Sequence, residues 1–231
     1  LLKIASMVPN CDILADIGTD HAYIPIYAVL NRICSKAVAA DLRKGPLEKA
    51  RENIRKYGVE DFIELRLGNG LEPILQKECD TVVIAGMGGM LIKDILSVSL
   101  DKARYTRLLL LQPNNAADVL RKWLHENGFE ITEERLAEDA GKIYCIISAK
   151  WTGNVVNKDE FYYYIGDKLI ESKDPLLRPY IEKKIKELDV IIAGRAKARK
   201  EEERKISGVY SMDTNTCVDI RNRLKSLVCN L

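Results

Sequence analysis

The sequence predicts an α/β fold in which a seven-stranded, mostly parallel sheet ends in an antiparallel hairpin and a helical region follows. Two observations support this prediction. Over the first 150 residues, short β-type runs alternate with segments whose apolar residues have helical spacing. After residue 152 the strand-like runs stop and only helical patterns follow. We therefore expect two domains, 1–152 and 153–231, without internal repeats or low-complexity segments.

Seven segments have the composition of strands. Two of them contain VVIA and LLLL, which are apolar at successive positions, as is typical of parallel strands buried on both faces. The last two are adjacent and joined by EDAGK, which predicts a hairpin turn. The predicted strands are 12–18, 36–41, 62–69, 80–86, 107–113, 128–137 and 142–150.

Four helices are predicted between these strands. Pro46 begins the second helix and Gly58 lies just past its end, which suits the backbone preferences of both residues. Asn114 and Asn115 are candidate N-caps of the fourth helix, and Gly128 follows it. The resulting topology of five parallel strands and a closing hairpin is not the dinucleotide-binding one. The predicted helices are 24–33, 45–58, 89–99 and 114–128.

The C-terminal region predicts a helical coiled-coil hairpin. The stretch 161–172 favours one short helix, and two longer segments carry apolar residues at alternating spacings of three and four. A connection at 207–215 joins these two segments, with Asp213 or Thr214 as N-cap. The apolar seams are Ile181, Ile185, Leu188 and Ile192 in the first helix, and Cys217, Ile220, Leu224, Leu227 and Leu231 in the second.

Composition places the chain among soluble globular proteins. It has 47% hydrophobic and 30% charged residues, no apolar run of about 18 residues and no signal-peptide pattern at its start, so we expect a cytoplasmic protein away from membranes. The six cysteines are scattered singly, which favours buried reduced thiols and no metal site. Residues 1–150 have a net charge of −1 and residues 151–231 one of +3, and this skew permits a polyanionic partner without requiring one. No obligate protein partner is evident.

The loop after the first strand, within LADIGTDHAYIP, predicts a site for a cation. Ligands of open α/β sheets bind beyond the carboxyl ends of the strands. A pyrophosphate would need a glycine-rich turn and a helix start free of negative charge, whereas this loop has a single glycine, Gly18, between Asp16 and Asp20. Alternatively, Asp20 only caps the following helix and His21 is a surface loop residue.

The next two loops add features that suit a nucleoside. Asp41 ends the second strand, where a carboxylate can accept hydrogen bonds from both hydroxyls of a ribose. Asn69, followed by Gly70, offers an amide that can pair with an adenine edge. S-adenosylmethionine is a nucleoside with a cationic amino-acid end and no phosphate, so it fits these loops together. Taken singly, each of these residues also suits an ordinary turn.

Two further loops are candidates for the reaction centre. AGMGGM places Gly86, Gly88 and Gly89 after a buried strand, where the backbone either takes unusual dihedrals or leaves room for a flat group. The alternative is a tight turn into a helix, which explains one of these glycines but not all three. LQPNN places Gln112 and Asn114 around a proline, where their amides can recognise a base edge, or where Asn114 caps a helix.

These motifs together resemble a known family. DIGTDHAYIP, AADLRKGPLEKA, LGNGL, AGMGG and LQPNN, in this order and followed by a helical tail, resemble the bacterial tRNA (adenine-22-N1)-methyltransferases over the whole chain. The resemblance implies a Rossmann-like class I methyltransferase domain, a C-terminal coiled-coil hairpin, and methylation by S-adenosylmethionine of N1 of an adenine in the D-arm region of tRNA. We expect the C-terminal region, which is rich in Lys and Arg, to bind the tRNA. The chain lacks the Asn/Asp-Pro-Pro-aromatic motif of many amino-group adenine methyltransferases.

The resemblance also implies which residues bind the cofactor, and the chemistry of the reaction indicates the catalytic candidates. These are Asp20, Gln112 and Asn114: we expect the two amides, with the backbone of residues 86–88, to frame the adenine, and Asp20 or a neighbour to stabilise charge that develops on it. The remaining alternatives are a methyltransferase for small molecules or proteins, and a non-catalytic RNA-binding module. The expected cofactor-binding residues are Asp16, Gly18, Asp20, His21, Ala22, Tyr23, Asp41, Leu42, Asn69, Gly70, Ala85, Gly86, Met87 and Gly88. The expected RNA-binding residues are Lys168, Arg178, Lys183, Lys184, Arg195 and Arg199, which could instead form a solvated face with ion pairs.

Overall fold

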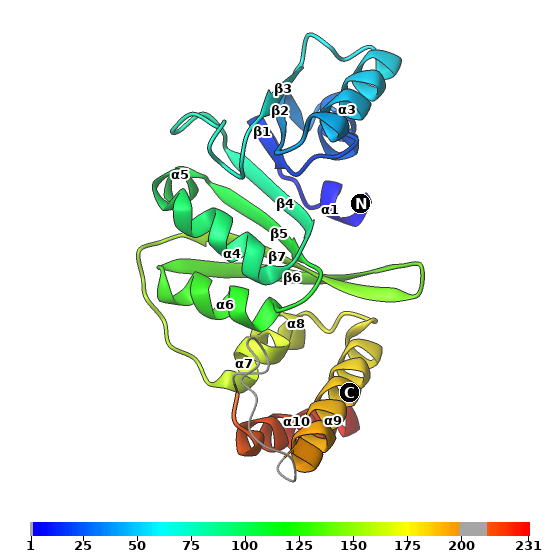
Figure 1. The fold of residues 1–231 in the computed structure, drawn as a ribbon, viewed down its shortest axis with the longest axis vertical. Helices are drawn as coiled ribbons and strands as arrows, with labels where there is room; N and C mark the ends of the chain where they lie inside the picture. Colours follow the sequence, from blue (N-terminus) through cyan, green and yellow to red (C-terminus); the bar gives the residue numbers. More distant parts are fainter. Residues whose placement is uncertain (1, 199–211) are drawn as a thin grey trace.

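The computed structural model describes residues 2–198 and 212–231, and its centre is one twisted sheet (Figure 1). The strand order is β3-β2-β1-β4-β5-β7-β6. Each strand lies within two residues of its predicted position, so the predicted sheet is confirmed. The strands are β1 (Cys11–Ile17), β2 (Cys34–Asp41), β3 (Ile63–Leu67), β4 (Thr81–Met87), β5 (Leu108–Pro113), β6 (Phe129–Asp139) and β7 (Lys142–Trp151).

Among the strands of this sheet, β7 alone runs opposite in direction to the others. The strands β1 to β5 pair in parallel, and β7 lies antiparallel between β5 and β6. Ala140 and Gly141, which connect β6 to β7, both have positive φ angles of 47° and 72°. Two left-handed residues form the turn whose twist matches an antiparallel hairpin. The predicted closing hairpin is therefore confirmed, and in Figure 1 it reaches beyond the neighbouring strands.

Helices cover both faces of the sheet. The helices α1 (Leu2–Ala5), α2 (Tyr23–Leu30) and α3 (Lys44–Tyr57) share a core with one face, and α4 (Gly89–Val98), α5 (Leu100–Tyr105) and α6 (Ala117–Glu126) share a core with the other. Successive strand residues therefore contribute to opposite cores: Val83 and Leu110 to the first, Val82 and Leu109 to the second. This explains the continuous apolar runs in the sequence.

Two expectations about helix ends were wrong. Neither Asn114 nor Asn115 caps α6, because its N-cap is Ala116 in a left-handed conformation with a φ of 48° and no side-chain cap. The stretch 161–172 forms two helices, α7 (Glu160–Ile165) and α8 (Asp167–Ser172), instead of one. The break is Gly166, whose φ of 90° is unfavourable for other residues.

The last two helices pack against each other. They are α9 (Leu177–Ala198) and α10 (Thr214–Cys229), and Asp213 caps α10 as predicted by accepting hydrogen bonds from the backbone N–H groups of residues 215 and 216. The seam residues Ile181, Leu188, Cys217, Ile220 and Leu224 are buried.

One seam residue was predicted wrongly. Leu231 lies beyond the end of α10 and is 48% exposed. Residues 207–211 of the predicted connection lie outside the described residues. The supercoil itself stays a prediction.

A buried ion pair joins the sheet to the helices that follow it. Arg121 of α6 donates from Nε to Glu134 Oε1 of β6 at 2.7 Å, and both side chains are almost completely buried. The same guanidinium donates to the carbonyl oxygens of Tyr163 and Tyr164 in α7, at 2.9 and 3.2 Å. One core also runs from the sheet into α9 and α10. These contacts cross the predicted boundary at residue 152, and the division into two domains stays a prediction.

The cysteines are unpaired, and four of them are buried as expected. Cys229 is exposed at the end of α10 and Cys11 is half-buried, so burial does not extend to all six. In the parts of the chain that the structure describes, no helix is long and apolar enough to cross a bilayer. No group of three or more His, Cys, Asp or Glu side chains is arranged there to hold a metal ion.

Candidate active site

The loops that follow β1 to β5 meet at one edge of the sheet, because the carboxyl ends of parallel strands point the same way. The register places Asp16 of β1 beside Ala39 of β2 and Val83 of β4. The predicted cofactor residues from four separate parts of the sequence are thereby brought to a common edge.

Asp16 is a buried carboxylate at the end of β1. It is 5% exposed, and the Thr19 hydroxyl donates to its Oδ2 at 2.6 Å. Burial, with a further contribution from the charge of Asp41, raises the pKa of Asp16 to about 6. No Lys or Arg of the described residues forms an ion pair with it. A buried carboxylate without a cationic partner suits a ligand that carries positive charge.

The loop after β1 has an unusual backbone. Gly18, Asp20 and Ala22 have φ angles of 75°, 44° and 57°, all in the left-handed region. Residues other than glycine rarely adopt this conformation, and such strain collects at ligand sites. Asp20 does not cap α2, because the N-cap is Ala22 and no side chain bonds to the helix start. The alternative in which Asp20 is only a helix cap is therefore wrong.

His21 has partners on both sides. Its Nε2 lies 3.3 Å from Asp20 Oδ2, and its ring stacks on Tyr23 with centroids 5.3 Å apart. Asp20 and Tyr23 are exposed, whereas the Ala22 side chain is buried. The three polar side chains form one group in which His21 is half-buried and its two partners are exposed, and Ala22 offers only backbone to a ligand.

Asp41 ends β2 with one carboxylate oxygen available. Its Oδ1 accepts a hydrogen bond from the Arg43 backbone N–H at 2.8 Å. Its Oδ2 accepts none within the described chain, although the side chain is buried. Leu42 is exposed beside it and provides an apolar surface.

Asn69 lies in the loop after β3, and its exposed side chain has no hydrogen-bond partner in the described segments. Gly70 has a φ of 53°, and a Cβ there would lie 2.8 Å from Ile95 Cγ2. A side chain at Gly70 would therefore strain the backbone and also clash, which fixes this turn as glycine.

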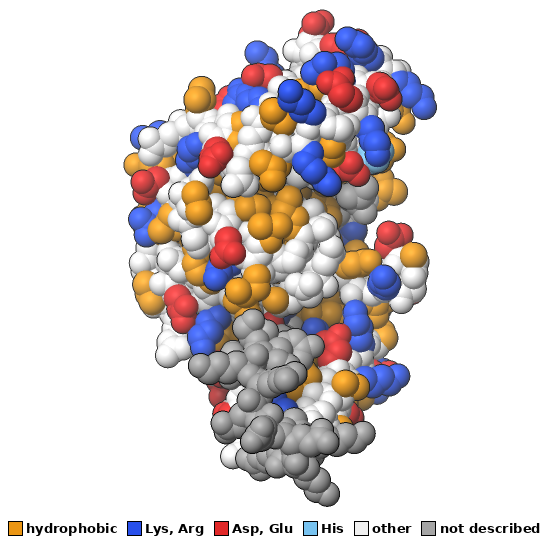
Figure 2. All heavy atoms as spheres, viewed as in Figure 1, with side chains coloured by type: hydrophobic (Ala, Val, Ile, Leu, Met, Phe, Trp, Pro, Cys, Tyr) orange, Lys and Arg blue, Asp and Glu red, His pale blue; other side chains and the backbone are white. Residues whose placement is uncertain are grey.

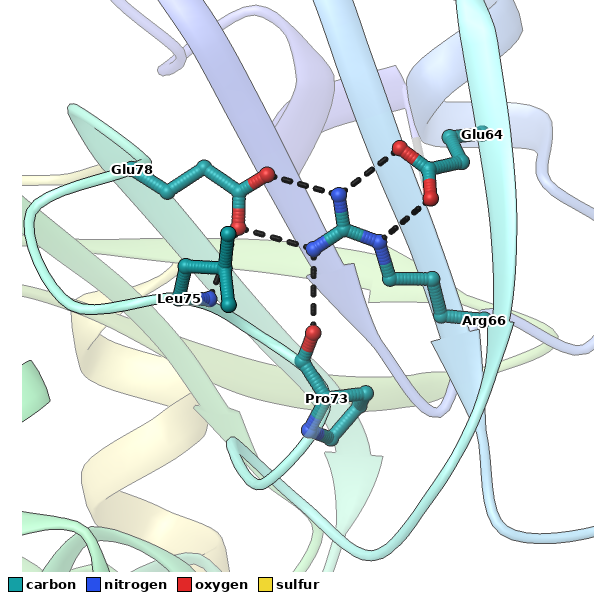
Figure 3. A network of polar contacts seen from close by, with 5 residues as sticks. All are labelled: Glu64, Arg66, Pro73, Leu75 and Glu78. Carbon is teal, nitrogen blue, oxygen red and sulfur yellow. Dashed lines mark hydrogen bonds and ion pairs between the residues drawn. The ribbon is translucent and has the colours of Figure 1, made fainter.

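An Arg66 network anchors the segment after this turn (Figure 3). Arg66 of β3 donates to both oxygens of Glu78 at 2.8 and 2.6 Å, to Glu64, and to the Pro73 carbonyl oxygen at 2.9 Å. Glu78 also accepts from the Leu75 backbone N–H at 2.7 Å. Hydrogen bonds from Arg66 lower the pKa of the Glu78 carboxyl. The sequence does not indicate this network, because Glu64, Arg66 and Glu78 have the spacing of ordinary surface charges.

A closed set of hydrogen bonds surrounds Gly86 at the end of β4. Gly86, with a φ of 77°, lies at an irregularity between Ala85 and Met87. Its N–H donates to Gln112 Oε1 at 2.9 Å, and its carbonyl oxygen accepts from Asn114 Nδ2 at 2.7 Å. Gln112 Nε2 in turn donates to Asn114 Oδ1 at 3.0 Å. Both amides thus hold the peptide of Gly86, and a contact with the base stays a prediction.

The two following glycines allow a close approach of two loops. A Cβ on Gly89 would lie 2.3 Å from the Ala116 carbonyl oxygen, and one on Gly88 would lie 3.0 Å from Asn115 Oδ1. Gly89 also donates its N–H to the Asn115 carbonyl oxygen at 2.9 Å. The space at these positions is therefore filled by the loop after β5, and Gly86 alone requires the unusual dihedrals.

Met87 reaches from β4 over the first loop. A Cβ on Gly18 would lie only 2.2 Å from Met87 Cε. Met87 Cε is the end of a flexible side chain that can move away, so the positive φ of Gly18, 75°, is what favours glycine at this position.

The expected RNA-binding residues differ in their surroundings. Lys168 pairs with Glu171 and Lys184 with Glu187, at 2.7 and 2.8 Å. Arg195 donates to the Met212 carbonyl oxygen. The exposed cations of this set are Arg178 and Lys183, and Arg199 lies outside the described residues. Acidic and basic side chains are interspersed over the face in Figure 2, so charge alone does not mark an RNA surface there.

The sheet order, with β7 antiparallel between β5 and β6, and the acidic carboxyl edge define the Rossmann-like fold of class I methyltransferases. A protein of the NADB-Rossmann superfamily from Streptococcus agalactiae is similar over 98% of this chain and 95% of its own, with 30% identity and a TM-score of 0.83.

The family follows from the sequence match. The model of the tRNA (adenine(22)-N(1))-methyltransferase family matches residues 14–210, and the chain belongs to this family. The Bacillus subtilis tRNA (adenine(22)-N(1))-methyltransferase is 41% identical over 150 residues. That match spans 65% of this chain and 63% of the relative, which is just under two thirds of the relative's length.

A solved structure adds a ligand to the comparison. A putative tRNA (m1A22) methyltransferase of Streptococcus pneumoniae, in complex with S-adenosyl-L-methionine, is 30% identical with a TM-score of 0.82. The similarity covers 98% of this chain and 97% of that one.

Proposed function

We propose that this chain transfers a methyl group from S-adenosylmethionine to N1 of adenine 22 in tRNA. The observation that carries the proposal is the carboxyl edge of the sheet in a member of this family. Buried Asp16 and Asp41 lie at this edge together with Asn69, whose amide has no hydrogen-bond partner among the described residues. A tRNA substrate also places the enzyme in the cytoplasm.

Residues at the ends of three strands bind different parts of the cofactor. Asp16 attracts the positively charged amino-acid end, because it is a buried carboxylate without a cationic partner. Asp41 accepts a ribose hydroxyl through its available Oδ2. Asn69 pairs with the cofactor adenine, while Leu42 and Ala85 provide apolar contact. The Asp20–His21–Tyr23 group borders the methionine end of the same site.

The reaction places modest demands on the protein. The cofactor supplies an electrophilic methyl group on its sulfonium, and N1 of adenine already has a lone pair, so no proton has to be removed first. The residues therefore align the base and exclude water. The bonds of Gln112 and Asn114 to Gly86 fix the backbone where the base enters. Asp20, an exposed carboxylate, stabilises the positive charge that methylation leaves on the base.

The helical region 153–231 holds the tRNA body. N1 lies on the pairing edge of adenine, so the base must leave its partner or stack at a cost of a few kcal/mol. Arg178 and Lys183 are exposed cations suited to phosphate contacts. Such contacts orient the RNA without reading its sequence.

Methyl transfer to unmodified tRNA tests the proposal. We expect N1-methyladenosine when the protein is incubated with S-adenosylmethionine and unmodified tRNA and the digested product is identified by mass spectrometry. Asp41→Asn should reduce this transfer. Asp12→Asn, which changes an exposed carboxylate at the start of β1, far from the carboxyl ends of the strands, should not. Absence of transfer to any RNA, or transfer only to a protein or small molecule, would refute the proposal.

A further inference from the structure

A cleft of about 600 Å³ separates the loop after β5 from helix α9. One wall contains Asn114 and its neighbours with Met90 at the start of α4, and the opposite wall contains Lys183 and Val190 of α9. The first residues of β7, including Tyr144, also line it. A volume of this size is in the range of small-molecule and cofactor sites.

The cleft continues directly from the candidate active site. Asn114 belongs to both, because its Nδ2 bonds to the Gly86 carbonyl oxygen and it lines the cleft. The start of β7 lies at the same carboxyl edge, where the β6–β7 hairpin projects, and α9 runs away from below this hairpin (Figure 1). A substrate that reaches the end of β4 from this side therefore passes through the cleft.

The cleft exposes apolar and aromatic surface. Val190 is 73% exposed and Met90 is 42% exposed, and Tyr144 of β7, which is half-buried, also lines the cleft. Exposed apolar side chains that gather at a concave site indicate binding. Single-stranded RNA is recognised largely by stacking of its bases on aromatic side chains, to which Tyr144 is suited.

The charge of the cleft is positive. Lys183 is exposed and forms no ion pair within the described residues. Lys184 is bonded to Glu187, which is the one acidic residue among those that line the cleft in the described chain. The acidic charge is therefore already neutralised, and the charge of Lys183 remains. A partner with negative charge and flat apolar groups complements these walls, and nucleic acid has both.

We propose that this cleft receives the unpaired tRNA segment that carries the target adenine, with Lys183 on a phosphate and with Tyr144 and Val190 against a base beside the target. The proposal rests on the proposed function and adds the path of the RNA to it. A protein segment is the alternative occupant, which the experiments below distinguish.

The first test compares two exposed lysines of α9. Lys183 lines the cleft and Lys186 does not. For Lys183→Gln we expect tRNA binding to weaken several-fold and the slope of log K against log salt to fall by about one unit, as for loss of one phosphate contact. Lys186→Gln should change neither quantity, and both variants should bind S-adenosylmethionine as the wild type does. Equal effects of the two substitutions would overturn the assignment.

The second test places a negative charge in the cleft. Val190→Asp should lower kcat/KM for tRNA at least tenfold, because the carboxylate repels the RNA backbone, without changing the melting temperature or the affinity for S-adenosylmethionine. The matched control is Val98→Asp, an equally exposed valine at the opposite end of α4 from Met90. It should retain the wild-type kcat/KM.

The outcomes separate the two proposals. If the wild type methylates tRNA while Lys183→Gln and Val190→Asp keep its kcat/KM, the cleft is not the RNA path and is open to a protein partner. If the wild type transfers no methyl group to tRNA at all, the proposed function fails, and the RNA assignment of the cleft fails with it.

Discussion

Asp16→Asn should remove a loss of stability that the unliganded wild-type protein undergoes as the pH rises, while weakening the cofactor site. Asp16 is buried, and its pKa of about 6 lies above the value of 3.8 for a free side chain. The folded state therefore disfavours the ionised form, and the stability contributed by this group is fully present below pH 3.8 and is lost as the pH rises through about 6. The difference of about two pKa units corresponds to about 3 kcal/mol.

The comparison of two pH values isolates this effect. The amide that replaces the Asp16 carboxylate can still accept the Thr19 hydroxyl bond, and any cost of its unpaired N–H is the same at each pH. We expect the free energy of unfolding of Asp16→Asn, relative to the wild type, to rise by about 2 kcal/mol between pH 4 and pH 8 in urea titrations. Asp12→Asn, which changes an exposed carboxylate of the same strand, should show little change.

Asp16→Asn should weaken the binding of S-adenosylmethionine, although it removes the pH-dependent loss of stability. In the wild type, the affinity for S-adenosylmethionine should fall as the pH drops through about 6, because protonation removes the charge of Asp16. Asp16→Asn should bind weakly at every pH. A pH-independent stability difference together with wild-type cofactor affinity would refute this explanation of Asp16.

Three further substitutions test other parts of the site and fold. Gly18→Ala strains the backbone at a φ of 75°, while its Cβ, 2.2 Å from Met87 Cε, only requires that side-chain end to move, so calorimetry should show at least tenfold weaker cofactor binding. Recovery of the affinity in Gly18→Ala/Met87→Ala would contradict the explanation by backbone strain. Gln112→Ala leaves the Gly86 N–H unpaired, so kcat should fall more than cofactor affinity, and an unchanged kcat would argue against this role. Burial lowers the pKa of His125 to about 4, so its contribution to stability is present above pH 6.5 and is lost as the pH falls through 4. His125→Gln should therefore reduce the acid sensitivity of the fold, and identical acid unfolding curves of variant and wild type would contradict this role of His125.

The sheet was predictable because its signals are local. Continuous apolar runs such as 108–111 mark strands buried on both faces, and the adjacent strands around Ala140 and Gly141 indicate a hairpin. The carboxyl edge followed from the same assignment, since parallel strands end together. The candidate residues Asp16 and Asp41 could therefore be placed near each other before the structure was known.

The remaining features depend on contacts between distant segments. Ala22 and Ala116 hold left-handed conformations at two helix starts, where the sequence favours an Asp or Asn cap, because surrounding contacts overrule local preference. Gly89 is explained only by the loop at 115–116, which packs against it. The Arg121–Glu134 pair joins α6 to β6 and α7, and no spacing in the sequence indicates it.

The cleft beside α9 likewise could not be predicted. Its walls come from segments that are separated by tens of residues, and the heptad pattern of α9 identifies only its buried seam, not what the opposite side faces. Among the expected RNA-binding residues, sequence composition could not separate Lys183, which is exposed, from Lys184, which is bonded to Glu187.

Methyl transfer to two tRNA transcripts that differ at a single base tests the central claim most directly. One transcript carries adenine at position 22 and the other carries guanine, and both are incubated with the protein and labelled S-adenosylmethionine. We predict incorporation of one methyl group into the adenine transcript and none into the guanine transcript. Equal labelling of both transcripts, or labelling of neither, would contradict the claim.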